Sequence, residues 1–302
     1  MAPQVTKRQH YVWRAYLASW TQKSKIFCLR EGRIFPSNLM GVAQQRYFYR
    51  LQELNPKERD LIRQFAIRNS YGALKESNEQ WLQQFSFVFD LKKILEEKGV
   101  LDEEAKRIFK EAEIQLEESL HSIIEGQSKK YLDMLLDQDT SFYENEEDAM
   151  QFCFFFAMQY VRTPRILENM KINITEISGI DIHRVWSVSK IIVATNIAWA
   201  MFARRNEYAM SILFADGNRF IAGDQPIINT RAVAFDETPT AVEWFYPLSP
   251  RMAVLISESA QKGTLQISES EVQKYNELMF NSSYEQVYAI EEADLKAFQI
   301  ST

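Results

Sequence analysis

The sequence predicts an α+β fold, predominantly helical, with an antiparallel sheet built from N-terminal and C-terminal hairpins. Two observations lead to this fold class. Apolar residues recur at helical spacing through the middle of the chain, and after Arg205 the pattern changes to alternation. Turn residues separate short apolar runs near both ends of the chain. Helices and strands that are segregated in this way are typical of α+β proteins. We expect one compact domain over residues 1–302, with a helical lobe over residues 55–140.

Composition bounds what the protein can be. The chain has 302 residues, of which 46% are hydrophobic and 25% charged, as in ordinary globular proteins. Its nine glycines are about half the usual ~7%, which argues against glycine-rich loops that cradle phosphates. Its net charge of −6 argues against a general nucleic-acid coat protein, although a local basic cleft stays compatible with it. The two cysteines are far apart in the chain and fit a reducing cytoplasm, where we expect the protein.

The first half of the chain contains one hairpin and a helical region. Residues 25–29 and 34–35 flank the turn Arg30-Glu31-Gly32-Arg33, which predicts two paired strands. Asn55-Pro56 is a typical helix start. A long amphipathic region follows over residues 81–136, and we expect Gly99 to break it and Asp102 to cap the second part. The face opposite its apolar stripe is dense in Glu and Lys and is predicted to be solvated.

The second half begins with two apolar helices and continues as strands. We expect helices over 147–161, ending or kinking near Thr163-Pro164, and over 182–206. The apolar runs in them are shorter than the ~20 residues of a membrane span, so they are predicted to be buried helices and no membrane contact is expected. Asp216-Gly217 between apolar runs predicts a hairpin over 210–222. Further strands are expected over 242–246, 252–256 and 286–290, with a helix over 269–281.

Several well-known site signatures are absent from the sequence. It contains no GxGxxG, GxxxxGK[ST], HExxH or GxSxG motif, so we expect no nucleotide cofactor held by such a motif. The three histidines are His10, His121 and His183, and a three-histidine zinc site would need all of them. A metal site could only be rich in carboxylates, and we expect none.

Two polar groups in the first half of the chain are candidates for chemistry. Gln9-His10-Tyr11 places an imidazole beside an amide and a phenol, which suits acid/base work or phosphate contact; a local structural hydrogen bond is the alternative. Gln159 and Arg162 share one face at the end of an apolar helix, next to Tyr160. Arg162 could bind a phosphate or carboxylate of a ligand. Alternatively, it could form a buried ion pair, for which Asp224 is a candidate partner.

The strand region offers three more candidates. Asp224 lies between Gly223 and Pro226 in a rigid strand-to-loop junction, where it either has a functional role or bonds its own backbone. Arg251 follows the proline-bracketed turn Tyr246-Pro247-Leu248-Ser249-Pro250 and either adds to an anion site or lies on the surface. Asn276 on the last helix is either a hydrogen-bond donor to a ligand or a helix cap.

These segments together resemble a known family. Gln9-His10-Tyr11-Val12 is similar to the HYxP signature of the domain-of-unknown-function family 4238, although Trp13 stands where the family usually has proline. The family's other motifs are matched, in order, by Gln159-Tyr160-Val161-Arg162-Thr163-Pro164, Phe220-Ile221-Ala222-Gly223-Asp224-Gln225-Pro226, Tyr246-Pro247-Leu248-Ser249-Pro250-Arg251 and Tyr275-Asn276. The resemblance covers about residues 7–290. It implies a prokaryotic-type cytoplasmic protein, considered a candidate toxin or antiviral defence effector, and it assigns no reaction.

The resemblance makes one set of residues the main candidates for a reaction. We expect a nuclease-like effector that hydrolyses a phosphodiester, possibly in RNA, without a metal. In this scheme His10 is the general acid or base, Asp224 orients it and Arg162 binds phosphate, while Gln9, Tyr11, Gln159, Tyr160, Arg251 and Asn276 bind substrate. A basic rim is expected from Lys7, Arg8, Arg14, Arg46, Arg50, Arg162, Arg165 and Arg251.

Two alternatives stay open at this point. The same residues could form a binding or sensing module for a small anionic ligand or nucleotide. They could also form a buried polar network without catalysis, in which removal of one partner of a buried pair costs about 3–5 kcal/mol. The sequence does not fix the oligomeric state or a protein partner. The question for the structure is whether His10, Arg162 and Asp224 meet in an open pocket.

Overall fold

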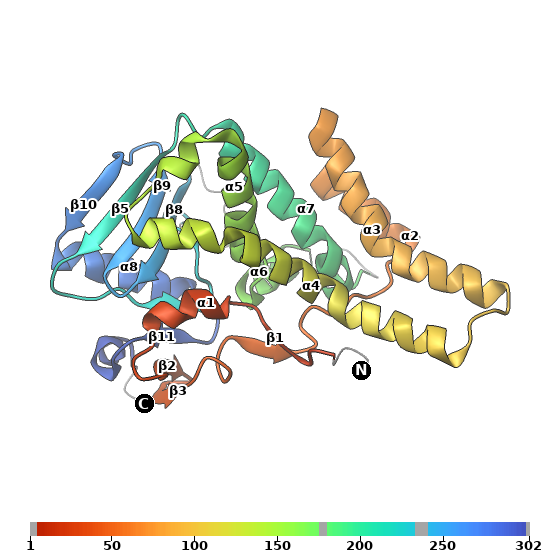
Figure 1. Cartoon of the computed structure of the whole chain (residues 1–302), viewed down its shortest axis with the longest axis horizontal. Coiled ribbons are helices and arrows are strands. Elements are labelled where there is room, and N and C mark those ends of the chain that lie inside the picture. The colour runs from red at the N-terminus through yellow and green to blue at the C-terminus, as the bar shows by residue number, and fades with distance from the viewer. Residues whose placement is uncertain (1–4, 175–179, 233–240, 300–302) are drawn as a thin grey trace.

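Helices form one side of the molecule and strands the other, as the α+β prediction requires (Figure 1). The computed structural model describes residues 5–174, 180–232 and 241–299. The principal helices are α1 (Arg14–Leu17), α2 (Pro56–Ile62), α3 (Gly72–Glu97), α4 (Glu103–Leu136), α5 (Glu146–Val161), α6 (Pro164–Ile174), α7 (Ile182–Ala203) and α8 (Glu269–Ser282).

Local sequence signals set most of the helix ends. Asn55 caps α2 in a full capping box with Glu58, and Pro56 is its first residue. Asp102 accepts a hydrogen bond from the backbone N–H of Ala105 at the start of α4, as predicted. Pro164 ends α5 but also begins α6, because proline is tolerated in the first turn of a helix. The helical segment that begins at Pro56 ends at Ile67, and Gly72 is the first residue of α3.

The centre of the core is the packing of α5 on α7 and on the strands. Phe152, Phe155 and Phe156 of α5 are completely buried. Phe156 makes edge-on ring contacts with Trp244 and Tyr246, at centroid distances of 6.0 and 5.9 Å. Aromatic rings therefore join the helical part to the sheet and fix the end of α5, where Gln159 and Arg162 lie.

The strands form three sheets. β10 (Gly263–Ile267), β5 (Ala209–Ala215), β9 (Met252–Ser257), β8 (Glu243–Ser249) and β7 (Ile228–Asn229) form a five-stranded sheet in that order, antiparallel except for the parallel β10–β5 pair. The second sheet has the order β3 (Arg33–Ser37), β2 (Ile26–Arg30), β11 (Val287–Ala289) and β6 (Ala222–Gly223). The N-terminal hairpin and the last strand thus share a sheet. β1 (Arg8–His10) pairs with β4 (Gln44–Arg46) as a separate two-stranded ribbon.

The predicted hairpin over residues 210–222 is wrong. β5 belongs to the five-stranded sheet, whereas β6 pairs with β11 in the other sheet. The backbone between them bonds to other parts of the chain: the N–H of Phe220 donates to the carbonyl of Pro250, and the side chain of Asn276 binds the N–H of Ile221. The chain therefore crosses from one sheet to the other at this point and delivers Asp224 to the four-stranded sheet.

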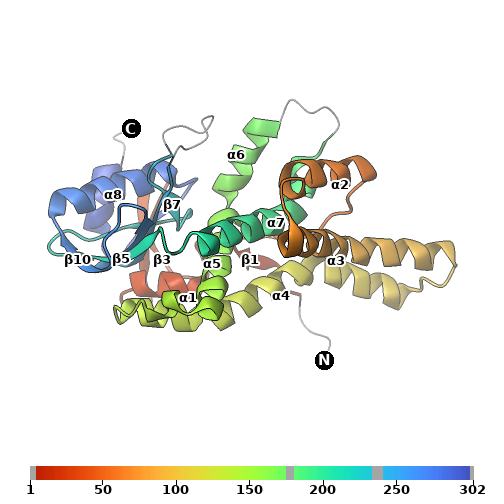
Figure 2. The ribbon, with the colours of Figure 1, turned by 90° about the horizontal axis from the view of Figure 1, so that it is seen from above.

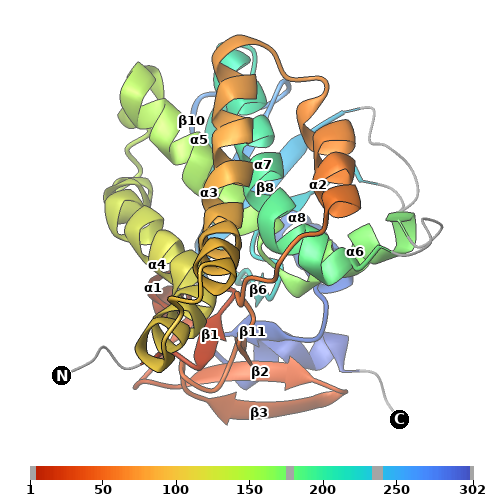
Figure 3. The same ribbon diagram turned by 90° about the vertical axis from the view of Figure 1, so that its right-hand side faces the viewer.

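The helical part has a projecting arm. α3 and α4 run side by side away from the body and meet at their far end, as Figures 1 and 2 show. The other end of α4 returns to the body above the β1–β4 ribbon and the β2–β3 hairpin (Figure 3). This course brings the middle of α4 close to the N-terminal segment that carries His10.

Among the helices of the described residues, one is long and apolar enough to cross a membrane by length and composition. It is α7, and 56% of its most apolar window is buried within the structure. α7 packs along α5, as a core helix of a globular protein does.

Candidate functional site

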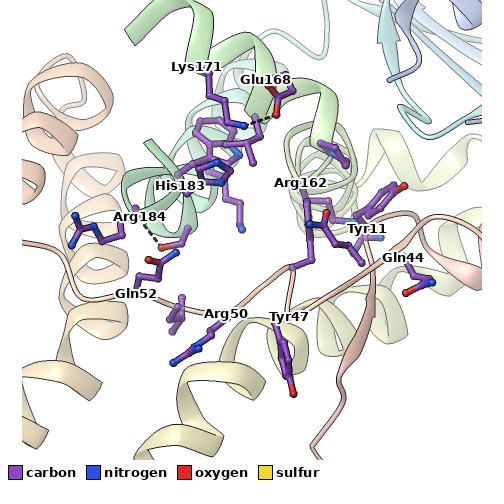
Figure 4. Close-up of a pocket in the computed structure, with 18 of the residues that line it drawn as sticks. Tyr11, Gln44, Tyr47, Arg50, Gln52, Arg162, Glu168, Lys171, His183 and Arg184 are labelled. Atoms are coloured by element: carbon purple, nitrogen blue, oxygen red, sulfur yellow. Dashed lines mark hydrogen bonds and ion pairs between the residues drawn. The ribbon is translucent and has the colours of Figure 1, made fainter. Parts of the chain in front are cut away.

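Two hollows lie on either side of the β1–β4 ribbon. The large cleft, bounded by residues 44–53, by α6 and α7 and by residues 284–286, has a volume of about 950 Å³ (Figure 4). The histidine pocket, bounded by residues 6–15 and by residues 118–125 of α4, has a volume of about 450 Å³. Both volumes lie in the range of small-molecule sites.

Cations outnumber carboxylates among the charged residues that line the large cleft. Among the described residues, seven arginine and lysine side chains line it, against four glutamates. The cations are Arg30, Arg50, Lys92, Arg162, Lys171, Arg184 and Lys190. The carboxylates are Glu53, Glu113, Glu168 and Glu285. Cations therefore outnumber carboxylates in the lining of this hollow, and six of the seven form ion pairs with carboxylates of the described residues.

Arg162 forms the inner wall of the cleft. Its side chain is fully buried, and its Nη2 donates to Glu125 Oε1 at 2.6 Å and to Gln159 Oε1 at 2.7 Å. Although burial itself lowers the pKa of Arg162, nearby Tyr49 and Glu125 raise it above the usual value, so the guanidinium stays charged. Its Nε and Nη1, and the Nε2 of Gln159, have no hydrogen-bond partner among the described residues. Buried donors without acceptors are costly, and an incoming acceptor would satisfy them.

The predicted pairing of Arg162 with Asp224 is wrong. The carboxylate partner of Arg162 is Glu125 of α4. Both oxygens of Asp224 accept from backbone N–H groups instead: Oδ1 from Tyr284 at 2.7 Å, and Oδ2 from Glu285 at 2.8 Å and Gln286 at 2.9 Å. The predicted role of Asp224 in orienting His10 is wrong for the same reason. Asp224 holds the segment 284–286, which is one wall of the large cleft.

Gln9 and Tyr11 also support the walls of the cleft by hydrogen bonds. The buried side chain of Gln9 donates to the carbonyl of Ile114 at 2.9 Å and accepts from the N–H of Tyr49 at 2.8 Å. The hydroxyl of Tyr11, which lines the cleft, accepts from Gln286 Nε2 at 3.0 Å. These contacts fix the walls formed by residues 44–53 and 284–286.

The other three predicted substrate contacts line neither hollow within the described part of the chain. The ring of Tyr160 packs edge-on against Trp244 at 4.8 Å. Arg251 donates to the carbonyl of Gly217 at 2.7 Å and closes the turn between β5 and the following segment. Asn276 accepts from the N–H of Ile221 at 3.0 Å and donates to the carbonyl of Arg219 at 2.8 Å. Each of these three side chains contacts another part of the protein, which is a structural role.

His10 lies in the histidine pocket and is partly buried. Its Nε2 is 3.1 Å from the carbonyl oxygen of Leu39. Because a carbonyl only accepts, Nε2 carries the proton in the neutral ring and Nδ1 is left as the basic nitrogen. Burial and the charge of Arg14 lower the pKa of His10, so the imidazole is neutral at neutral pH. His10 and Arg162 interact electrostatically but line different hollows.

Sequence reasoning missed the acidic face of α4, which was predicted to be solvated. Glu117 and His121 are buried, and Glu118 and Glu125 line the histidine pocket. Glu117 Oε1 lies 2.6 Å from Lys190 Nζ and 3.1 Å from His121 Nε2. A signal was present: residues 117, 118, 121 and 125 share one helix face through their spacing of three and four, and a histidine stands among them.

The two hollows are linked by buried polar contacts. Arg162 lines the large cleft and its partner Glu125 lines the histidine pocket. Lys190 lines the cleft and reaches His121 of the pocket through Glu117. A change of charge in one hollow therefore changes the electrostatic potential in the other through these two short chains of contacts.

The predicted basic rim does not converge as a unit. Of its members, Arg50 and Arg162 line the large cleft, while Arg8 and Arg14 line the histidine pocket. The further cations of the cleft come from β2, α3, α6 and α7, which the rim did not include. Within residues 5–174, 180–232 and 241–299, no group of three or more His, Cys, Asp or Glu side chains is arranged to hold a metal ion.

One comparison with known proteins gives a match. The family model described as "Protein of unknown function (DUF4238)" matches residues 8–292. The chain belongs to this family. No curated protein and no solved structure matches the chain.

Several residues of the DUF4238 motifs line or support the large cleft. Tyr11, Arg162 and Pro164, from two motifs, line the cleft. Gln9 and Asp224, from two motifs more than 200 positions apart in the chain, bind the backbone of two segments that line it, residues 44–53 and 284–286. Part of the motif residues therefore lie at the large cleft, as its lining or as its support, whereas His10 lines the histidine pocket. Arg251 and Asn276 line neither hollow.

Proposed function

We propose that this DUF4238 protein binds a phosphate-bearing ligand, a nucleotide or a short segment of RNA, in the large cleft. The observation that carries the proposal is the concentration of cations around this cleft in a chain whose net charge is −6. Such a charge distribution attracts anions to one place and repels them elsewhere on the surface. The cleft volume of about 950 Å³ accommodates a nucleotide with room for a neighbour.

Arg162 supports phosphate as the bound group. A guanidinium has five N–H donors in a planar fork that matches two oxygens of a phosphate. Arg162 uses Nη2 for Glu125 and Gln159, and its Nε and Nη1 have no partner among the described residues. Lys190, 5.2 Å above the ring centroid of Tyr49, adds a second buried cation on the same wall.

Nuclease-like phosphodiester hydrolysis is the second candidate. The observation that favours it is His10, a neutral imidazole with a free basic nitrogen, in a pocket beside Arg162. Asp224 has no part in this version of the site, since its carboxylate is used by residues 284–286. A toxin or defence role in the cytoplasm, implied by the family resemblance, would follow from cleavage of RNA and stays a prediction.

Fluorescence anisotropy with labelled oligoribonucleotides tests the binding proposal. We expect saturable binding that weakens steeply as salt rises, because each phosphate contact with Lys or Arg releases bound counterions. Unlabelled mononucleotides should compete, whereas a poly-glutamate peptide of equal charge should compete poorly, since it lacks phosphate groups. Binding that salt does not change, or equal competition by the peptide, would contradict the proposal. Electrophoresis of the recovered RNA separates a binder, which leaves it intact, from a hydrolase.

A further inference from the structure

The histidine pocket contains a set of side chains that the binding proposal does not use. It is lined by His10 and Arg8 of β1, Arg14 of α1, and Glu118, His121 and Glu125 of α4. Two imidazoles, two carboxyl groups and two guanidinium groups thus share a hollow of about 450 Å³. Such a mixture of acid, base and cation is typical of a catalytic site.

Two of these groups already have a side-chain partner. Glu125 is paired with Arg162, which packs against the pocket from α5. His121 is bonded to the buried Glu117 and burial lowers its pKa well below the usual value, so it stays neutral. Arg14 has no carboxylate partner among the described residues; its Nη1 lies 2.9 Å from Met40 Sδ. Within the part of the chain that the structure describes, neither His10 Nδ1 nor the carboxyl group of Glu118 makes a hydrogen bond or ion pair.

Glu118 is placed to act as an acid. It is half-buried in the pocket wall, and its carboxyl group has no hydrogen bond or ion pair within the described part of the chain. Burial and the nearby Glu125 raise the pKa of Glu118 to about 7, against the opposing charges of Arg162 and Arg14. At neutral pH a large fraction of Glu118 is therefore protonated while His10 is neutral. An acid and a base coexist in one pocket at the same pH, as concerted proton transfer requires.

We propose that the histidine pocket is an acid–base site for phosphodiester hydrolysis, with His10 as general base, Glu118 as general acid and Arg14 as the phosphate contact. This inference rests on the second candidate function above. In the step, His10 Nδ1 takes a proton from water as the water oxygen bonds to phosphorus. The bond from phosphorus to the leaving oxygen breaks, and Glu118 donates its proton to that oxygen. Water is consumed, and no metal, oxidant or further reactant is needed.

The replacement Glu118→Gln tests the assignment because it keeps the shape and removes the transferable proton. Two substrates report on it: an oligoribonucleotide, whose leaving alkoxide needs protonation, and bis(p-nitrophenyl) phosphate, whose leaving nitrophenolate does not. We expect E118Q to cleave the oligoribonucleotide about 10²–10³-fold more slowly and to lose less than about tenfold on the nitrophenyl ester. The wild type should lose activity on the oligoribonucleotide above about pH 7, where Glu118 ionises, and E118Q should lack this alkaline limb. Glu104→Gln, an exposed position on the same helix, is the matched control and should match the wild type.

The possible outcomes distinguish the acid role of Glu118 from the proposal that the protein hydrolyses phosphodiesters. Equal losses on both substrates would mean a structural role for Glu118 and overturn the assignment. An unchanged rate and pH profile in E118Q would overturn it too, while hydrolysis itself would stand. A wild-type protein that cleaves neither substrate would overturn the hydrolytic candidate together with this acid–base pair, and would leave the binding proposal for the large cleft in place.

Discussion

Replacement of Asp224 by alanine separates a structural role for this residue from a catalytic one. The carboxylate accepts three backbone N–H groups, at 2.7, 2.8 and 2.9 Å, from three consecutive residues of the segment 284–286. A hydrogen bond to a charged group contributes about 1.5–3 kcal/mol net. Three at the lower value give about 4.5 kcal/mol. The N–H groups of Tyr284 and Glu285 are only partly buried and can bind water in the variant, so we predict a loss of about 4 kcal/mol.

Urea unfolding followed by circular dichroism measures this loss. Asp216→Ala is the control, because Asp216 is exposed and makes one side-chain hydrogen bond, with Gln266 Nε2 at 2.8 Å. An exposed substitution of this kind should change the unfolding free energy by less than about 0.5 kcal/mol. Ligand binding should weaken in D224A because the wall formed by residues 284–286 is released. A loss of under about 1 kcal/mol in D224A would refute the reasoning.

Three further predictions concern buried groups. Arg162→Met should lower the unfolding free energy by about 3–5 kcal/mol, because Glu125 loses its ion-pair partner, and the double variant with Glu125→Gln should recover part of it; equal losses in both would contradict the pairing. The folded-state pKa of Glu118, about 7, lies above its usual value near 4.5, so its protonated form is favoured by folding and stability is lost as pH rises through this window. Thermal unfolding of E118Q should show a smaller decrease between pH 5 and pH 7 than the wild type, and identical pH profiles would contradict the placement of Glu118. Burial raises the pKa of Cys28 and Cys153 to about 12, so both thiols should resist a thiol reagent until the protein unfolds, and prompt labelling of the native protein would contradict their burial.

Local chemistry in the sequence was sufficient to predict most of the longer helices and the N-terminal hairpin, but not α6, which follows the proline where a helix end was expected. The caps at Asn55 and Asp102 and the turn at residues 30–33 are decided by neighbours within a few positions. The pairing of β6 with β11 could not be predicted in this way, because it depends on residues more than 60 positions apart. The Asp216-Gly217 signal marks a real turn, but the two segments that flank it enter different sheets.

In the candidate site too, contacts between near neighbours in the sequence could be predicted, and contacts between distant segments could not. The sequence indicated that Gln159 and Arg162 share a helix face, and the structure confirms this contact at 2.7 Å. It could not indicate that Glu125 is the partner of Arg162, since both α4 and α5 had to be placed first. Asp224 was interpreted as catalytic because it stands in a motif, yet its motif position reflects the support of a cleft wall. A buried carboxylate that serves the backbone and one that serves a reaction have the same local sequence pattern.

The central claim is that the large cleft binds phosphate through its cations, and a charge-reversal pair tests it most directly. Arg30 and Arg50 are exposed residues of the cleft, whereas Lys23 and Arg33 are exposed residues that do not line it. The two double variants to glutamate have the same net charge. Anisotropy titration of an oligoribonucleotide at fixed salt should show affinity reduced about 100-fold or more in R30E/R50E and by less than about threefold in K23E/R33E. Equal losses in the two variants, or none in either, would contradict the claim.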